Sequence, residues 1–339
     1  MKVLITGAAG FLGGYLVEEL LNHGYEVVGL DNYSKYGKVN RSYGDHPGYR
    51  FVEGDAKDVS LLKELLADCD QFIALAAIIG GIPLFHEYAY DLLAENERII
   101  ASGLDAAVRA HKNRKLKRII VISSSMVFES ASVFPTPEGE QLRCPPPQST
   151  YGFQKLACEY FAKGAREQYG LPYTIIRPFN LIGIGEKRAR VDKEVISGNI
   201  KLAMSHVVPD LVQKVLKGQN PLHILGDGSQ IRCLTYAGDA AQGVRLAMES
   251  DRAVNEDFNI STAETITILE LARLIWRRIR GDEPFRYVCD KPYQYDVKKR
   301  IPSVEKAKRV LGFEATTGLE VALDEVIPWV RKEIEAGGI

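Results

Sequence analysis

The sequence contains few of the residues that build disulfide-bonded or metal-binding proteins. Its 339 residues include five cysteines, an odd number. They are widely scattered along the chain: Cys69, Cys144, Cys158, Cys233 and Cys289. None belongs to a Cys-x-x-Cys pair, and none has a histidine nearby at a spacing typical of metal ligands. We therefore expect reduced, structural cysteines, with no disulfide framework and no metal site.

Long apolar runs and an excess of charge of one sign are absent too. No run of 18 apolar residues occurs, and no basic segment with an apolar signal region precedes the first predicted strand. The formal net charge is −1, so the chain has no overall attraction to nucleic acid or to an anionic membrane. We expect a soluble, cytoplasmic protein whose partners are small molecules or proteins, with no nucleic acid and no membrane among them.

What the sequence does have is a glycine-rich stretch at its start. A short apolar run, long enough only for a buried strand, is followed by apolar residues at helical spacing. Gly7, Gly10 and Gly13 lie where a backbone must turn sharply, approach a pyrophosphate and pack a helix against a strand. A second predicted strand at 25–30 ends in Asp31, at about the ~20-residue spacing typical of such sites. This strand, turn and helix predict a dinucleotide-binding site.

Strands and helices alternate beyond this point. Further strands are predicted at 49–53, 71–75, 118–122 and 173–176, with helices between them. This order predicts an α/β protein with a Rossmann-type doubly wound parallel sheet, whose ligands lie at the carboxyl ends of the strands. Beyond Arg177 the alternation breaks. We expect a dinucleotide-binding domain at 1–178 and a smaller mixed α/β substrate domain at 179–339, with an approximate boundary and room for later elements to return to the first domain.

A tyrosine and a lysine one helical turn apart form the candidate catalytic pair. A helix predicted at 150–169 places Tyr151 and Lys155 on one face, because they are spaced i, i+4. Tyrosine has an ordinary pKa near ~10, so a tyrosine that takes a proton near neutrality needs a cation close by. Ser124, at the end of the strand at 118–122, can hold a substrate oxygen against Tyr151. A tyrosine and a lysine at this spacing often occur by chance. In a chain that also has a dinucleotide-binding stretch, the pair is much stronger evidence for a catalytic site.

Together these segments resemble a known family, the extended short-chain dehydrogenase/reductases, and among them the nucleotide-sugar epimerases and dehydratases. The similarity is greatest to the enzymes of the UDP-glucose 4-epimerase type, and it extends from Met1 to the last predicted helix at 319–334. The motifs that carry it follow one another in the family's order: Thr6 to Gly13, Asp31, Gly54-Asp55, Leu75 to Ala77, Ser123-Ser124, Tyr151 with Lys155, Arg177 to Asn180, Gly226 to Arg232 and Ser303 to Phe313.

The resemblance implies a site for NAD and for a nucleotide-diphosphate sugar. It implies that Tyr151 is the general base and acid, that Lys155 holds the nicotinamide ribose, and that Ser124 binds substrate. Asp31 would bind the adenosine ribose and repel a 2′-phosphate, which favours NAD over NADP. The implied cofactor-binding residues are Gly7, Gly10, Phe11, Leu12, Gly13, Asp31, Asn32, Asp55, Ala56, Leu75, Ala76, Ala77, Asn96, Ser123, Tyr151, Lys155 and Pro178. The implied substrate-binding residues are Gly80, Gly81, Ser124, Ser125, Met126, Asn180, Val208, Arg232, Lys291 and Arg300.

The reaction is predicted by elimination within the family. Family members first oxidise the sugar at C4, and the residues after the catalytic hydroxyl decide the next step of the reaction. The 4,6-dehydratases have an Asp-Glu pair where this chain has Ser125 and Met126, while decarboxylases usually have a glutamate, and 3,5-epimerases a cysteine, in place of Met126. The 4-reductases generally use NADPH, which Asp31 disfavours. The resemblance thus implies a 4-epimerase. A 4,6-dehydratase, a 3,5-epimerase, a decarboxylase and a non-catalytic dinucleotide sensor remain alternatives.

The nucleotide and the assembly are predicted only by resemblance. Gly80-Gly81 is similar to the branch that acts on GDP-sugars, so UDP, GDP and dTDP all remain open. The family commonly has an arginine near Tyr293, and Lys291 or Arg300 would replace it on the diphosphate. The helices predicted at 96–107 and 150–169 are apolar on more than one face, and in this family they form a four-helix interface. We therefore expect a homodimer.

Overall fold

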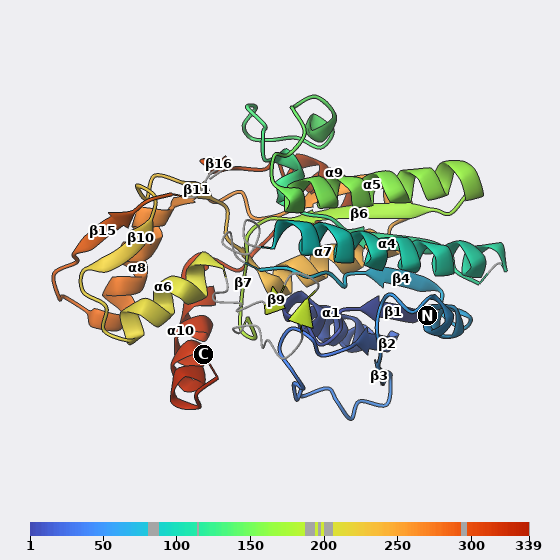
Figure 1. Ribbon diagram of the computed structural model, residues 1–339, viewed down its shortest axis with the longest axis horizontal. Helices are drawn as coiled ribbons and strands as arrows, with labels where there is room; N and C mark the ends of the chain where they lie inside the picture. The colour runs from blue at the N-terminus through green and yellow to red at the C-terminus, as the bar shows by residue number, and fades with distance from the viewer. Residues whose placement is uncertain are drawn as a thin grey trace.

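The computed structural model describes residues 1–80, 88–113, 115–186, 206–292 and 297–338, together with two short strands, β8 (Glu194–Val195) and β9 (Gly198–Asn199). Its centre is a seven-stranded parallel sheet (Figure 1). The strands are β1 (Lys2–Thr6), β2 (Glu26–Asp31), β3 (Tyr49–Glu53), β4 (Gln71–Ala74), β5 (Arg118–Ile122), β6 (Tyr173–Pro178) and β13 (Glu256–Ile260). Their order is β13-β6-β5-β4-β1-β2-β3. The predicted doubly wound α/β sheet is confirmed.

Helices cover both faces of this sheet. On one face lie α1 (Phe11–Asn22) and α7 (Ala237–Glu249), whose apolar side chains share a core with β1 and β13. On the other face lie α2 (Val59–Leu66), α4 (Ala89–Lys112) and α5 (Thr150–Tyr169), packed on the opposite side chains of β1 and on side chains of β2, β4, β5 and β6. Helices α4 and α5 run side by side (Figure 1). Central strands such as β5 are buried on both faces, which is why they appear in the sequence as short apolar runs.

The seventh strand, β13, is the element of the sheet that the sequence patterns did not predict. It pairs with β6 in parallel and begins with two acids, Glu256 and Asp257. A strand with two charges at its start lacks the apolar pattern of a buried strand. The structure satisfies these charges with Arg177 and Lys306, which form ion pairs with them.

A second unit is packed around its own core. It contains α6 (Val207–Leu216), α8 (Ile268–Arg280) and α10 (Leu319–Glu335), with β10 (Leu222–Leu225) paired to β15 (Tyr287–Asp290). A three-stranded sheet has the order β14 (Ile266–Thr267), β11 (Ile231–Arg232) and β16 (Lys299–Arg300). A separate pair of short strands is formed by β7 (Leu181–Ile182) and β12 (Thr235–Tyr236). Helix α9 (Glu305–Leu311) packs near β13 of the large sheet. The domain division at residue 178 stays a prediction, with α7 and β13 as later elements that join the large sheet.

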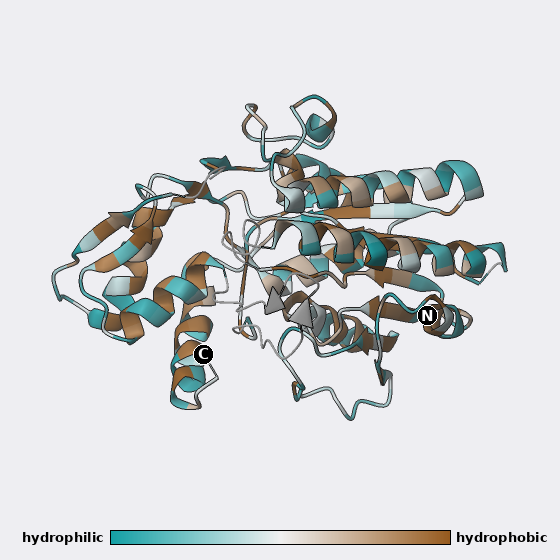
Figure 2. Cartoon of the chain, viewed as in Figure 1, coloured by the Kyte–Doolittle hydropathy of each residue, from teal (hydrophilic) through white to brown (hydrophobic). Residues whose placement is uncertain are grey.

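Apolar residues are concentrated in the interior of both units. In Figure 2 the central strands are largely brown, whereas the outer loops are mostly teal. No helix of the described residues is long and apolar enough to cross a membrane. Within the same part of the chain, no group of three or more His, Cys, Asp and Glu side chains is arranged to hold a metal ion.

Candidate active site

The chain turns sharply between β1 and α1, and this turn requires glycine. Gly7 has a φ of +77°, in the left-handed region, and a Cβ there would lie 3.0 Å from the backbone of Ala76. A Cβ on Gly13 would lie 2.1 Å from the carbonyl oxygen of Gly7. No side chain caps the N-terminus of α1 at Gly10, so its first N–H groups remain for an anion. The turn therefore offers the close backbone approach and the helix terminus that a dinucleotide pyrophosphate needs.

Asp31 lies beside this turn, at the end of β2. Its carboxylate accepts hydrogen bonds from the N–H of Ala9 at 3.1 Å and from the N–H of Tyr33 at 2.7 Å. Burial raises the pKa of Asp31, while the two N–H groups act in the opposite direction. Each carboxylate oxygen keeps a lone pair beyond these bonds, so Asp31 is fixed in place and can still accept from ribose hydroxyls.

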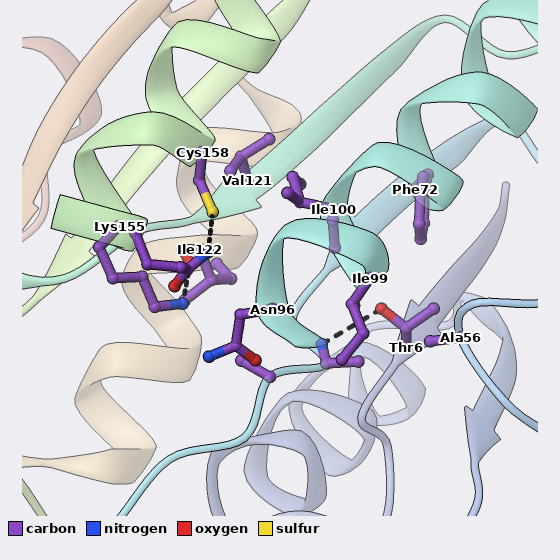
Figure 3. Close-up of a pocket in the computed structure, with 15 residues that line it drawn as sticks. Thr6, Ala56, Phe72, Asn96, Ile99, Ile100, Val121, Ile122, Lys155 and Cys158 are labelled. Carbon is purple, nitrogen blue, oxygen red and sulfur yellow. Dashed lines mark hydrogen bonds between the residues drawn. The ribbon is translucent and has the colours of Figure 1, made fainter. Parts of the chain in front are cut away.

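A small pocket opens where β1, β4 and β5 end, between the sheet and the helices α4 and α5 (Figure 3). Its lining includes five of the predicted cofactor-binding residues: Ala56, Ala76, Ala77, Asn96 and Lys155. Three elements of the parallel sheet thus bring residues that are far apart in the sequence to one edge. This is the place that the strand ends predicted for the cofactor.

Two side chains hold the segment that follows β4. The hydroxyl of Thr6 accepts from the N–H groups of Leu75 at 3.3 Å and Ala76 at 3.2 Å. The amide of Asn96 accepts from the N–H of Ile78 at 2.7 Å and donates to its carbonyl at 3.0 Å. Asn96 therefore fixes the backbone next to the pocket, and its own predicted contact with NAD stays a prediction.

Tyr151 and Lys155 are brought together on α5 as their spacing predicted. Lys155 is buried, and its Nζ donates to the carbonyl oxygen of Ile122 at 3.0 Å (Figure 3). The same Nζ lies 6.0 Å from the centroid of the Tyr151 ring, which is also buried. The cation thus lies near both the end of β5 and the tyrosine ring, where its remaining N–H groups can orient a ribose hydroxyl.

Ser124 lies directly after β5 and presents its hydroxyl as the N-cap of a short 3₁₀ helix at Ser125–Phe128. Its Oγ accepts from the N–H of Met126 at 3.2 Å, and this bond leaves the hydroxyl proton for an acceptor such as a sugar oxygen. Met126 is buried in one apolar cluster with Tyr151. The side chain packed beside the candidate base is therefore a thioether, which can neither donate nor accept a proton in a reaction.

Glu159, which no sequence pattern singled out, lies one turn beyond Lys155 on α5. Its Oε1 accepts from the hydroxyl of Ser123 at 2.7 Å, and its two oxygens accept from Nε and Nη2 of Arg177, each at 2.7 Å. Arg177 also pairs with Asp257 at 2.7 Å. The hydroxyl of Ser123 is therefore turned to the interior, which leaves its carbonyl for the predicted contact with the cofactor.

Two predicted substrate-binding arginines lie side by side in the second unit. Arg232 on β11 and Arg300 on β16 are direct partners across neighbouring parallel strands. Arg232 is largely buried, which holds its guanidinium in place. Guanidinium groups match the charge and geometry of a diphosphate, and these two arginines occupy paired positions of neighbouring strands. Lys291, the alternative to Arg300, is exposed and directly follows β15.

The structure also shows where several other predicted substrate-binding and cofactor-binding residues lie. The side chain of Val208 is buried in the core of the second unit, so a substrate contact there would come from its backbone. Asn180 adopts a φ of +36° and donates its amide to the carbonyl of Cys233 at 3.2 Å. Gly80 lies in the described segment after β4, whereas Gly81 lies outside the described residues. Asp55 accepts from the N–H of Lys57 at 2.9 Å.

Comparison with known proteins agrees with this arrangement. The model of the NAD dependent epimerase/dehydratase family matches residues 3–261. The chain is 28% identical, over 97% of its length and 98% of the relative's, to a putative UDP-glucose 4-epimerase of Methanocaldococcus jannaschii. It is equally similar, over 98% of both chains, to the UDP-N-acetyl-alpha-D-glucosaminuronate decarboxylase of Bacillus cytotoxicus. A solved structure of UDP-glucuronic acid 4-epimerase from Bacillus cereus is also similar, with a TM-score of 0.81 and 26% sequence identity. The match covers 98% of this chain and 99% of that one, and that enzyme was solved in complex with UDP-glucuronic acid and NAD.

Proposed function

Because the chain belongs to the NAD dependent epimerase/dehydratase family, with NAD as its cofactor, we propose that it is a nucleotide-sugar 4-epimerase. The observation that carries this proposal is the pair of residues after Ser124. Ser125 and Met126 supply neither a carboxyl group nor a thiol, and Met126 packs against the same cluster as Tyr151. A sugar oxidised at C4 thus meets no second proton carrier at these two positions, and reduction at C4 is the remaining outcome.

The residues of the site have distinct roles in this proposal. Bound at the glycine-rich turn and Asp31, NAD would supply an acceptor and donor of hydride for C4. Tyr151 takes the proton of the C4 hydroxyl and later gives it back, Ser124 donates a hydrogen bond to the C4 oxygen, and Lys155 places its ammonium group beside the tyrosine ring. Arg232 and Arg300 would hold the diphosphate while the sugar rotates to present its other face. The net reaction changes stereochemistry and leaves the cofactor in its original redox state.

A decarboxylase is the second candidate, because a relative of equal identity has that activity. Like the epimerase, it would oxidise C4, but it would then lose the C6 carboxyl group as carbon dioxide. The carbanion equivalent left at C5 would take a proton from solvent. A 4,6-dehydratase and a 3,5-epimerase would also exchange protons at C5 or C3. In 4-epimerisation the hydrogen that leaves C4 is returned to C4. Incorporation of solvent hydrogen at C5 or C3 therefore distinguishes all three alternatives from 4-epimerisation.

The test is turnover in deuterium oxide with a panel of UDP-, dTDP- and GDP-hexoses and UDP-hexuronic acids. We expect the C4 epimer of one of them by NMR, with no deuterium on carbon, no carbon dioxide and no net NADH absorbance. The substrate that turns over would identify the nucleotide. Deuterium at C5 or C3, release of carbon dioxide or stoichiometric NADH would each contradict the proposal.

We also propose that the enzyme is a homodimer joined through α4 and α5. Their outer surface carries large exposed side chains: Tyr90 at 65%, Phe153 at 49%, Tyr160 at 57% and Phe161 at 41%. Phe153 and Tyr160 are seven residues apart and lie on one stripe of α5, as expected for a helix that packs against another.

Light scattering is expected to give twice the chain mass of 37.7 kDa. Changing Phe153 and Tyr160 together to glutamate should give monomers, because the charges would be buried without partners. Tyr287→Glu is the control, since Tyr287 is similarly exposed but lies on β15. A wild-type mass of one chain would contradict the proposal.

A further inference from the structure

Arg41 lies in the loop between β2 and β3 and reaches back to the glycine-rich turn. Its Nη2 donates to the carbonyl oxygen of Gly10 at 3.2 Å and to that of Ala9 at 3.4 Å. The residue is 31 positions from Gly10 in sequence, and it belongs to none of the motifs that indicate the cofactor or the substrate. The sequence patterns therefore gave no reason to place a guanidinium at the N-terminus of α1.

Two glycines make room for this guanidinium. A Cβ on Gly14 would lie 2.8 Å from Cζ of Arg41, and a Cβ on Gly185 would lie 3.3 Å from its Nη1. Gly14 comes after the three glycines that the turn itself uses, so the position of Arg41 explains why this residue also lacks a side chain. Gly185 belongs to the segment after β7. Arg41 thus joins three segments: the glycine-rich turn, the loop after β2 and the start of the second unit.

The charge of Arg41 has no counter-ion in the described part of the chain. No carboxylate there lies within ion-pair distance of its guanidinium, whereas Lys38, in the same loop, pairs with Glu53 at 3.5 Å. The Nε of Arg41 is buried and, among the described residues, has no hydrogen-bond partner. A half-buried cation beside the positive end of α1 is unfavourable by itself and becomes favourable when an anion binds next to both.

We propose that Arg41 binds the pyrophosphate of NAD and holds the dinucleotide against the glycine-rich turn. Nη2 donates to the two carbonyls, and Nη1 can donate to phosphate oxygens. A cofactor that must accept and return a hydride within one catalytic cycle has to stay bound throughout. Arg41 provides a cation for this retention that the backbone N–H groups of the turn cannot supply. The inference rests on NAD as the cofactor and is independent of which sugar is epimerised.

The test measures binding of NAD, ADP and adenosine to the full chain after removal of bound nucleotide. Arg41→Gln is expected to raise the Kd of NAD and ADP by roughly 10-fold to 100-fold, the range for losing hydrogen bonds to a charged group. The Kd of adenosine should not change, because adenosine has no pyrophosphate. Lys38→Gln is the matched control: it removes an exposed cation from the same loop and should leave all three constants as in the wild type.

A second variant keeps Arg41 but displaces it. Gly14→Ala places a methyl group where the guanidinium lies, and we expect the same selective loss of NAD and ADP affinity with an unchanged thermal melting temperature. Wild-type affinity for NAD in Arg41→Gln would overturn the proposal. So would an equal loss for adenosine, ADP and NAD, because this result would mean that Arg41 only shapes the loop and does not contact the pyrophosphate.

Discussion

Tyr151→Phe is expected to lower kcat by about 10²-fold to 10⁴-fold, the range typical of losing a general acid-base group. The substitution removes one oxygen and leaves a ring that fills the same place in the cluster with Met126. Without the hydroxyl, the proton of the C4 hydroxyl has no acceptor when the hydride leaves. The measurement is single-turnover formation of the C4 epimer or the 4-keto sugar.

The matched control is Tyr169→Phe, because Tyr169 also lies on α5 but is exposed at the C-terminal end of the helix and does not line the pocket. It should leave kcat unchanged. The affinity of Tyr151→Phe for NAD should stay close to that of the wild type, since the contacts predicted for the cofactor are mainly with the glycine-rich turn and Asp31. Unchanged turnover in Tyr151→Phe would remove the tyrosine from the mechanism. Absence of turnover in the wild type, with NAD bound, would favour a dinucleotide sensor.

The sheet could be predicted from the sequence wherever the pattern of a strand is local. Six strands were predicted and confirmed, because a strand buried on both faces needs consecutive apolar residues, as in Arg118–Ile122. The seventh, Glu256–Ile260, was missed because its first two residues are acids. Those acids are compatible with the sheet only through Arg177 and Lys306, which lie far from them in the sequence. A pattern within one strand cannot contain that information.

The same distinction applies to the candidate site. The glycines of the turn, and Tyr151 with Lys155, depend on local geometry, so their spacing predicts where they lie. Arg41 and Glu159 depend on partners in other elements, and their types and spacing alone suggest only surface charges. Glu159 is separated from Arg177 by 18 residues and from Ser123 by 36. Their roles can be inferred only from the fold, which places opposite charges beside Glu159 and the two glycines Gly14 and Gly185 beside Arg41.

The ion pair of Glu159 and Arg177 connects α5, which carries the candidate catalytic residues Tyr151 and Lys155, to the sheet. Both side chains are fully buried, and the Arg177 guanidinium also lies 5.2 Å from the ring of Phe128. Burial favours the neutral form of Arg177, but the charges of Glu159 and Asp257 outweigh it and raise its pKa. The pair therefore stays charged in the folded protein and fixes α5 relative to β6.

Arg177→Met is expected to lower the free energy of unfolding by about 3–5 kcal/mol, as when one partner of a buried ion pair is removed. Glu159 would be left buried with only the hydroxyl of Ser123 as a donor. Denaturant unfolding measures the loss. The control is Arg278→Met on α8, because Arg278 also pairs with two carboxylates, those of Glu320 and Asp324, but at the surface. It should cost less than ~1 kcal/mol.

The pH dependence of stability tests the other ion pair of Arg177, the one with Asp257. Burial raises the pKa of Asp257, but the charges of Arg177 and Lys306 outweigh it and lower the pKa to about 2. A carboxyl whose pKa is lower in the folded state contributes stability fully above its unfolded pKa of about 3.9, and this contribution is lost as the pH falls towards 2. In Arg177→Met only Lys306 would remain as a partner, so stability should depend less steeply on pH in this range. An acid limb as steep as that of the wild type would show that Arg177 does not hold Asp257 in its charged form.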